Sequence, residues 1–367
     1  MAGLTLDPTK CVRALAKFSE CTHCVEICPV EIISVESHLP SFNMSQCVGC
    51  GGCVSLCPTE AFTLDDFNQT NFFFDFVQSE DTLISCKKNV PCVAALSVEH
   101  LTSLALLKED LVCDTGHCEG CEIAGKLKPQ IDKNIEEANF VLEAIQSSKS
   151  IKTEKIAYAP EDVADNDDRR GFFRNITIEN AAKAKHDFDR KVEVESDEEL
   201  RHEVFTKDIS RLKQKEIPDK RKIFFTALKR APKPSQYHVI DAHELSFTSM
   251  KNLDEDTCTA CQMCYRICPT AALSSDMKNS KIDFDPFLCV KCHLCHDVCE
   301  PDSITLADTF DLKQFFEPEV KQLAKFTIRR CHECDNYFIY RGGEVVCHRC
   351  RLEEEEAKEL WGIQKGV

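Results

Sequence analysis

The 367-residue sequence lacks the features that mark a substrate site, a membrane span or a secreted protein. It has no phosphate-binding loop, no dinucleotide fingerprint and no nucleophile paired with a base. No apolar run approaches the roughly 18 residues that a membrane-spanning helix needs, and no basic, apolar leader opens the chain. We therefore expect a cytoplasmic protein without a transmembrane segment, and a non-catalytic subunit rather than a stand-alone enzyme.

Positive charge is also scarce. The 45 Lys and Arg residues are outnumbered by 62 Asp and Glu, which gives a net charge of −17 with His neutral. A chain of this charge repels nucleic acid and is attracted to basic partners. We expect no nucleic-acid partner, although the charge is equally well explained by solubility alone.

Cysteine, in contrast, is abundant. The chain has 25 Cys in four groups, with eight in residues 1–66, five in 86–121, eight in 258–299 and four in 331–350. Many cysteines are common in short secreted proteins held by disulfides, but in a long chain without a leader they indicate metal binding. The groups therefore predict metal or iron–sulfur sites in a reducing compartment.

The most specific motif spans residues 258–299. Each half has the spacing C-x2-C-x2-C-x3-C, in which three close thiolates hold one [4Fe-4S] cluster and the fourth ligates the neighbouring cluster. Neither a disulfide framework nor a pair of zinc knuckles requires this spacing. One predicted ligand set is Cys258, Cys261, Cys264 and Cys299. The other is Cys268, Cys289, Cys292 and Cys295. Residues 258–307 resemble a bacterial-type two-cluster ferredoxin domain, which implies two β-hairpin-plus-helix halves and the transfer of single electrons.

Residues 1–66 repeat this motif with one departure. The second half is complete, but in the first half Phe18 stands where the first Cys is expected. Cys11, upstream of Phe18, is the predicted substitute, and the alternative is a three-iron or labile site with Cys11 as a buried thiol. The first ligand set is then Cys11, Cys21, Cys24 and Cys57. The second is Cys28, Cys47, Cys50 and Cys53.

Residues 67–147 are predicted to form a small α/β domain, because strand-like and helix-like segments alternate. The expected strands are Asn71–Val77, Thr82–Cys86 and Leu111–Asp114, and the expected helices are Val98–Leu107 and Pro129–Ile145. The segment distantly resembles the small iron–sulfur subunit of methyl-viologen-reducing hydrogenases linked to heterodisulfide reductase, through its strand-to-loop cysteines and the sequence H-C-E-G-C.

The five cysteines of this segment predict a fifth metal site. Three of them form a C-x4-C-x2-C run in a hydrophilic loop, where Gly116 and Gly120 let the backbone approach a cluster closely. The predicted ligand set is Cys92, Cys113, Cys118 and Cys121. Cys86 is left out because it falls on an expected strand. An iron–sulfur cluster is the expected occupant, and zinc or a reactive dithiol are the alternatives.

Residues 148–250 are polar and predict a charged, partly helical linker. Their one basic island, Lys213–Lys233, surrounds the apolar residues Ile223, Phe224 and Leu228. Such an amphipathic basic helix would clamp either an acidic partner or the chain's own ferredoxin modules. The intramolecular interpretation is the simpler one.

Two C-x2-C pairs with twelve residues between them lie in residues 331–350. On facing hairpins, such pairs place four thiolates around one zinc ion, and a redox iron in the same site is the alternative. The predicted ligands are Cys331, Cys334, Cys347 and Cys350. Residues 326–350 resemble a rubredoxin-like zinc ribbon, and the acidic helix expected after it argues against nucleic acid.

These features predict an α+β multidomain fold. Its expected parts are two 2[4Fe-4S] ferredoxin modules (1–66 and 251–310), an α/β Cys-rich domain (67–147), a charged linker (148–250) and a zinc ribbon with an acidic C-terminal helix (311–367). The resemblance implies a polyferredoxin with four [4Fe-4S] clusters, a fifth cluster in the α/β domain and one Zn²⁺. Its expected partners are redox proteins, above all a larger anaerobic complex of the formate dehydrogenase, hydrogenase or heterodisulfide-reductase type. An iron–sulfur assembly or maturation factor and a redox sensor are the alternatives.

Overall fold

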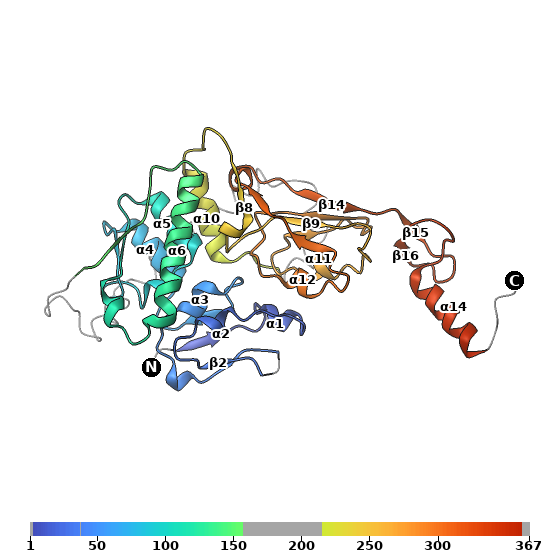
Figure 1. Ribbon diagram of the computed structural model, residues 1–367, viewed down its shortest axis with the longest axis horizontal. Coiled ribbons are helices and arrows are strands. Elements are labelled where there is room, and N and C mark those ends of the chain that lie inside the picture. Colours follow the sequence, from blue (N-terminus) through green and yellow to red (C-terminus); the bar gives the residue numbers. More distant parts are fainter. Residues whose placement is uncertain (1–2, 37, 157–214, 362–367) are drawn as a thin grey trace.

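The computed structural model describes residues 3–36, 38–156 and 215–361. Figure 1 shows an N-terminal module beneath an α/β unit, a second module beside them, and a small C-terminal unit at the far end. One apolar core is shared by residues 4–151 and 223–315, and another lies within residues 258–326. Among the described residues, no helix is both long and apolar enough to cross a membrane.

The first and last strands of the first module pair with each other. Strand β1 (Leu4–Leu6) pairs antiparallel with β4 (Phe62–Leu64), so that Leu4 lies opposite Leu64. The elements between them are α1 (Val12–Leu15), α2 (His23–Ile27), β2 (Ile33–Ser34), β3 (Ser41–Phe42), η1 (Met44–Gln46) and α3 (Gly52–Leu56). Gly51, before α3, has a φ of +76°, and a Cβ there would lie 2.7 Å from the Cβ of Ala95. Only glycine fits this position without strain.

The α/β unit contains a three-stranded parallel sheet in the order β5-β6-β7. Its strands are β5 (Leu83–Ile84), β6 (Val112–Asp114) and β7 (Lys152–Glu154). Its helices are α4 (Gln69–Gln78), η2 (Val93–Ala95), α5 (Val98–Leu107), η3 (Gly116–Gly120) and α6 (Ala124–Ala144). The helix predicted over residues 98–107 and the strands predicted near 82–86 and 111–114 are thus confirmed.

One predicted strand is wrong, because Asn71–Val77 lies within helix α4. Phe72, Phe73 and Phe76 are buried on one face of this helix, where α4 packs against α5. The side chain of Asn68 caps the helix by accepting a hydrogen bond from the Asn71 N–H over 2.9 Å. Aromatic residues favour strands in isolation, but here their spacing supplies the apolar face of a helix, and packing decides the outcome.

Part of the expected linker is a packed helix. Helix α10 (Asp219–Arg230) buries Ile223, Phe224 and Leu228 in the same core as α5. The Lys220 Nζ donates hydrogen bonds to the carbonyls of Ser55 and Cys57 in the first module. The basic island therefore clamps the chain itself, as the intramolecular interpretation predicts.

The second module is inserted into the first core between two paired strands. β8 (Val239–Asp241) pairs with β13 (Thr309–Asp311), and next to them β9 (Lys251–Leu253) pairs with β12 (Ile304–Leu306). The elements inside are α11 (Met263–Ile267), β10 (Leu273–Ser274), β11 (Lys281–Phe284) and α12 (Leu294–Asp297). Strand β14 (Lys321–Lys325) returns to pair with β11. Outside the inserted strands lie η4 (Ala242–Glu244) and α13 (Lys313–Phe316).

The C-terminal unit is a hairpin followed by a helix. Strands β15 (Ile328–Arg330) and β16 (Tyr337–Ile339) pair antiparallel, and α14 (His348–Leu360) follows. In Figure 1 this unit lies beyond β14, away from the α/β unit. The expected acidic helix is confirmed as α14. The second C-x2-C pair lies at the start of this helix rather than on a second hairpin.

Candidate iron–sulfur and metal centres

The structure brings Cys11 to the other cysteines of its predicted set. Cys11 is the residue before α1 and is 7% exposed. Burial raises the pKa of the Cys21 thiol to about 11, and the neighbouring thiols of Cys57 and Cys11 raise it further. Burial likewise raises the pKa of Cys24 to about 12, with Cys21, Cys57 and Cys11 adding to the rise. These four thiols therefore lie together, with the short helix α1 folding Cys11 back over the site.

The other four cysteines of the first module form a second group. Burial raises the pKa of Cys50, and the thiols of Cys28 and Cys47 add to the rise. For Cys53, burial again raises the pKa most, followed by Cys50 and then by Cys24 of the first group. The two groups are thus adjacent, through Cys24 and Cys53.

The second module repeats this arrangement. Burial raises the pKa of Cys258, with Cys261 and Cys299 adding to the rise. Burial also raises the pKa of Cys292, to which Cys268, Cys289 and Cys295 contribute. After burial, the largest contribution to the raised pKa of Cys264 comes from Cys295 of the other group. Three of the four predicted sets each line one small cavity together. That each set binds a cluster stays a prediction.

These groups suit a multi-iron cluster rather than a single ion. A cluster needs thiolates, and burial raises the pKa of thiols such as Cys24 and Cys264, so cluster binding must displace their protons. Backbone N–H groups face the sulfurs: Ala61 N–H donates to Cys57 Sγ over 3.2 Å, and Ala260 N–H donates to Cys258 Sγ over 3.4 Å. Such hydrogen bonds to cluster sulfurs are one way a protein sets the reduction potential.

The five cysteines of the α/β unit are divided differently from the sequence prediction. Burial raises the pKa of Cys92 to about 12, and Cys50, Cys86 and Cys118 add to the rise. Burial also raises the pKa of Cys118, with contributions from Cys86 and Cys121. Cys86 follows the end of β5 instead of lying on it. Cys86, Cys92, Cys118 and Cys121 therefore lie near one another in the loops that follow β5 and β6.

Cys113, which the sequence places in the predicted set, lies apart from this group. It is fully buried in β6, opposite Ile84 of β5 and Thr153 of β7. Burial alone raises its pKa to about 12, with no contribution from another cysteine. Its thiol belongs to the interior of the sheet, where a buried Cys packs like a small apolar side chain.

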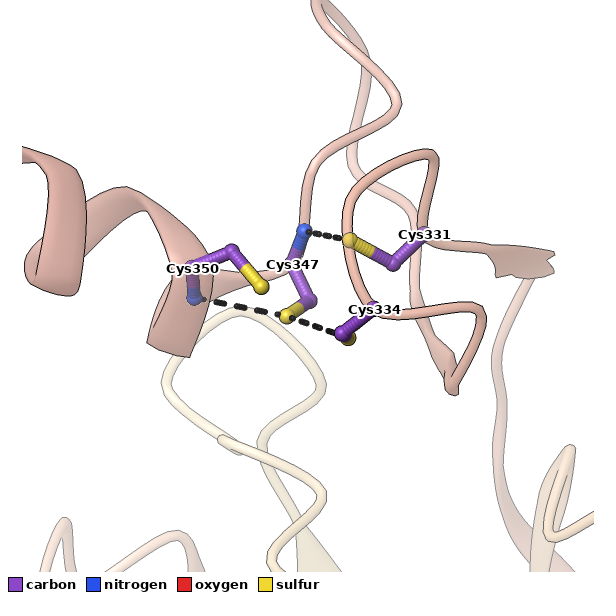
Figure 2. A group of neighbouring side chains, drawn as sticks. All are labelled: Cys331, Cys334, Cys347 and Cys350. Atoms are coloured by element: carbon purple, nitrogen blue, oxygen red, sulfur yellow. Dashed lines mark hydrogen bonds between the residues drawn. The ribbon is translucent and has the colours of Figure 1, made fainter.

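The C-terminal cysteines form a compact group. The Sγ atoms of Cys331, Cys334, Cys347 and Cys350 all lie within 4.8 Å of one another, and Figure 2 shows them converging from the hairpin loop and the start of α14. The Cys347 N–H donates to Cys331 Sγ over 3.2 Å. Although burial raises the pKa of Cys331, backbone N–H groups of Cys347, Cys334 and Glu333 lower it to about 6. This set fits one tetrahedral metal ion.

Two basic residues that the sequence did not single out as functional lie next to cysteine carbonyls. The Lys220 Nζ donates to the Cys57 carbonyl over 2.6 Å. The Arg341 guanidinium, from the C-terminal unit, donates to the carbonyl of Cys258 and to those of Glu255 and Asp256 at 3.0 and 2.6 Å. The basic island around Lys220 is a sequence feature from which its contact could have been predicted. Arg341 lies in a turn that has no such feature.

Comparison with known proteins agrees with this geometry. Two family models match, both described as 4Fe-4S dicluster domains, one over residues 19–62 and the other over 250–300. No curated protein and no solved structure matches. The chain thus contains two 4Fe-4S dicluster domains of ferredoxin type, with about four [4Fe-4S] clusters implied, and this is the signature of an iron–sulfur electron-transfer protein. Cys11, the α/β unit and the C-terminal unit lie outside the matched residues.

Proposed function

We propose that the protein is a polyferredoxin that carries single electrons as a subunit or partner of a larger anaerobic oxidoreductase. The observation that carries this proposal is the grouping of sixteen cysteines into four sets, each with the four thiols that a cubane requires. The clusters supply the one-electron chemistry when bound. The chain supplies the ligands, the buried surroundings and the N–H donors that hold them.

The partner is proposed from chemistry alone. A chain with a net charge of −17 is attracted to a basic docking surface. A formate dehydrogenase, a hydrogenase or a heterodisulfide-reductase-like complex is the class of enzyme that uses several low-potential clusters in series. These partners belong to a reducing, cytoplasmic setting, where free thiols persist.

Two further metal centres belong to the proposal. The group of Cys86, Cys92, Cys118 and Cys121 is proposed to hold a fifth iron–sulfur cluster, since three half-buried thiols and the exposed thiol of Cys121 lie in neighbouring loops. The group at Cys331 is proposed to hold structural zinc, because four cysteine ligands close the coordination shell and leave no open position for chemistry. An iron in that site remains the alternative occupant.

The competing proposal is an assembly or maturation factor, for which the clusters would be cargo. Nine of the sixteen ferredoxin thiols are buried and one, Cys261, is exposed. This distribution favours electron transfer, because a carrier that hands over whole clusters needs accessible ligands. The discriminating experiment is an anaerobic redox titration followed by electron paramagnetic resonance, in the presence and absence of a cluster-free acceptor protein. Reversible reduction of all clusters with none lost to the acceptor supports electron transfer, and loss of clusters to the acceptor overturns it.

A further inference from the structure

The two modules meet at a small apolar contact that lies between one cysteine group of each. Val12 and Ala16, from α1 and its end, pack against Leu294 of α12. Val12 is 2% exposed and Leu294 is fully buried. Cys21 from the first module and Cys292 from the second pack against this contact. Val12 follows Cys11 directly, and Leu294 lies between Cys292 and Cys295 in the sequence.

A polar contact joins the same two surfaces. The Glu20 N–H, next to Cys21, donates a hydrogen bond to Asp297 Oδ2 on α12 over 3.1 Å. The contact therefore has an apolar centre and a directional hydrogen bond at its edge, and in the first module Val12 and Glu20 each lie next to a cysteine.

Helix α10 fixes the separation of the two modules. Lys220 holds the Ser55 and Cys57 carbonyls of the first module at 3.1 and 2.6 Å. The next residue, Arg221, donates to the Phe287 carbonyl of the second module over 2.5 Å. Because adjacent residues of one rigid helix hold both modules, the facing of Cys21 and Cys292 is built into the core rather than left to a loose contact.

We propose that this contact joins the two modules into a single electron path, a proposal that rests on the proposed electron-transfer function. The five cysteine groups then follow one another along this path. In order, they are the groups that contain Cys261, Cys292, Cys21, Cys50 and Cys118. Within each module the successive groups adjoin through packed helices: α11, which carries Cys264, packs against α12, which carries Cys295, and α2, which carries Cys24, packs against α3, which carries Cys53. Cys50 and Cys92 pack against the same apolar core, where α3 of the first module contacts η2 of the α/β unit.

The two ends of this path are at the surface. Cys261 and Cys121, in the first and last groups of the path, are exposed, whereas Cys21 and Cys292 at its middle are not. An electron donor docks at one end of the path and an electron acceptor at the other. The two modules thus act in series and do not serve separate partners. Each step moves one electron from one iron–sulfur site to the next, so that the donor site is oxidised by one and the acceptor site is reduced by one, without a proton or a further reactant.

The test uses the full chain, loaded anaerobically with iron and sulfide and mixed with less than one equivalent of reduced methyl viologen. Samples frozen at successive times are read by electron paramagnetic resonance to follow how the electron distributes between the modules. In the wild type, exchange between the modules should be independent of protein concentration, because it is intramolecular. In Cys292→Ser, exchange should depend on concentration, because only collisions between molecules remain.

The matched control is Cys258→Ser, which alters the outer group of the same module and should keep the concentration-independent exchange. If Cys292→Ser does not hold its fold, the pair Cys21→Ser and Cys47→Ser makes the same comparison in the first module. Concentration-independent exchange that survives in Cys292→Ser or Cys21→Ser overturns the path. So does a wild type that exchanges only by collision. Clusters that reduce reversibly without exchange sink this proposal alone, whereas clusters that do not reduce reversibly sink the proposed function itself.

Discussion

Arg221 and Glu99 form an ion pair in the interior of the protein. The Arg221 Nε donates to Glu99 Oε1 over 2.7 Å, and both side chains are 1% exposed. The two other guanidinium nitrogens donate to the carbonyls of Phe287 and Phe247 at 2.5 and 2.7 Å. Each guanidinium nitrogen of Arg221 thus donates to a different segment of the chain. The α/β unit, α10 and the second module therefore meet at this side chain.

Arg221→Met should therefore destabilise the protein by about 3–5 kcal/mol, because it leaves the Glu99 carboxylate buried without a partner. The measurement is urea unfolding of the loaded protein, followed by far-ultraviolet circular dichroism. The double variant Arg221→Met with Glu99→Leu should recover part of the loss, since no unpaired charge remains. Lys152→Met is the control, because its pair with Asp110 is exposed and should matter by less than about 1 kcal/mol. Equal effects of the two single variants would contradict the assignment.

His100 should make the protein sensitive to mild acid. Burial, and to a smaller extent the Lys220 charge, lower its pKa from 6.5 to about 3. Its Nδ1 pairs with Ser97 Oγ at 2.9 Å, while its Nε2 is buried without a hydrogen-bond partner among the described residues. The unfolded chain binds a proton at higher pH than the folded protein does, so this contribution to stability is present above pH 6.5 and is lost as the pH falls towards 3.

His100→Asn should consequently flatten the loss of stability just below pH 6.5, and His243→Asn, at an exposed position, should leave it unchanged. Thermal unfolding at a series of pH values measures both. An unchanged acid limb in His100→Asn would show that another group titrates there.

Metal analysis should find at least about 16 iron atoms for four cubanes and about one zinc per chain. The motive is the arrangement of the thiols in four ferredoxin groups and one compact C-terminal group. The protein is purified anaerobically and reconstituted before analysis. Fewer than about 10 iron atoms after full reconstitution would rule out four cubanes.

Cys86→Ala and Cys113→Ala should show which of these two cysteines is a ligand of the fifth site. Cys86→Ala should lower the iron content by about two to four atoms, because it removes a ligand. Cys113→Ala should keep the iron and lower only the stability, since its thiol packs inside the sheet. The reverse pattern would restore the set inferred from the sequence.

Cys11→Ser should lower the iron content of the protein, because it removes a ligand from the cluster site that Cys11 shares with Cys57. Phe18→Ser is the matched control, because Phe18 is 67% exposed and stands where the ferredoxin motif would have its cysteine. Iron content and the electron paramagnetic resonance spectrum report the result. If Cys11→Ser keeps the wild-type iron and spectrum, Cys11 is an ordinary buried thiol.

The cysteine groups could be predicted because C-x2-C spacing is a local constraint that holds whatever the rest of the chain does. The helix over residues 98–107 was equally accessible, since Ser97 caps it and its apolar residues have helical spacing. Helix α6 begins at Ala124, before the expected start at Pro129, and the proline lies inside it. Proline favours the first helical position, but Pro129 is the sixth residue of α6, where it removes one backbone hydrogen bond, so its position did not mark the boundary.

The remaining features depended on contacts between distant residues. The choice between Cys86 and Cys113 required knowing where β5 and β6 end, because one residue along a strand decides whether a thiol faces the loop edge or the sheet interior. The burial of Arg221 could not be read from a basic segment, since its partner Glu99 lies more than a hundred residues earlier in the chain. Solvated charge and buried charge have the same local sequence signature.

Because the second module is inserted between β8 and β13, its cysteines are synthesised before the last residues of the host core. Phe315 packs against Phe224 and Phe247 at ring-centroid distances of 5.2 and 6.1 Å, yet it is translated after every cysteine of the second module. Domains fold as units while the chain emerges from the ribosome. Every cysteine of the second module is therefore synthesised before the host core can close around Phe315, whereas strand β14, which pairs with β11, follows later.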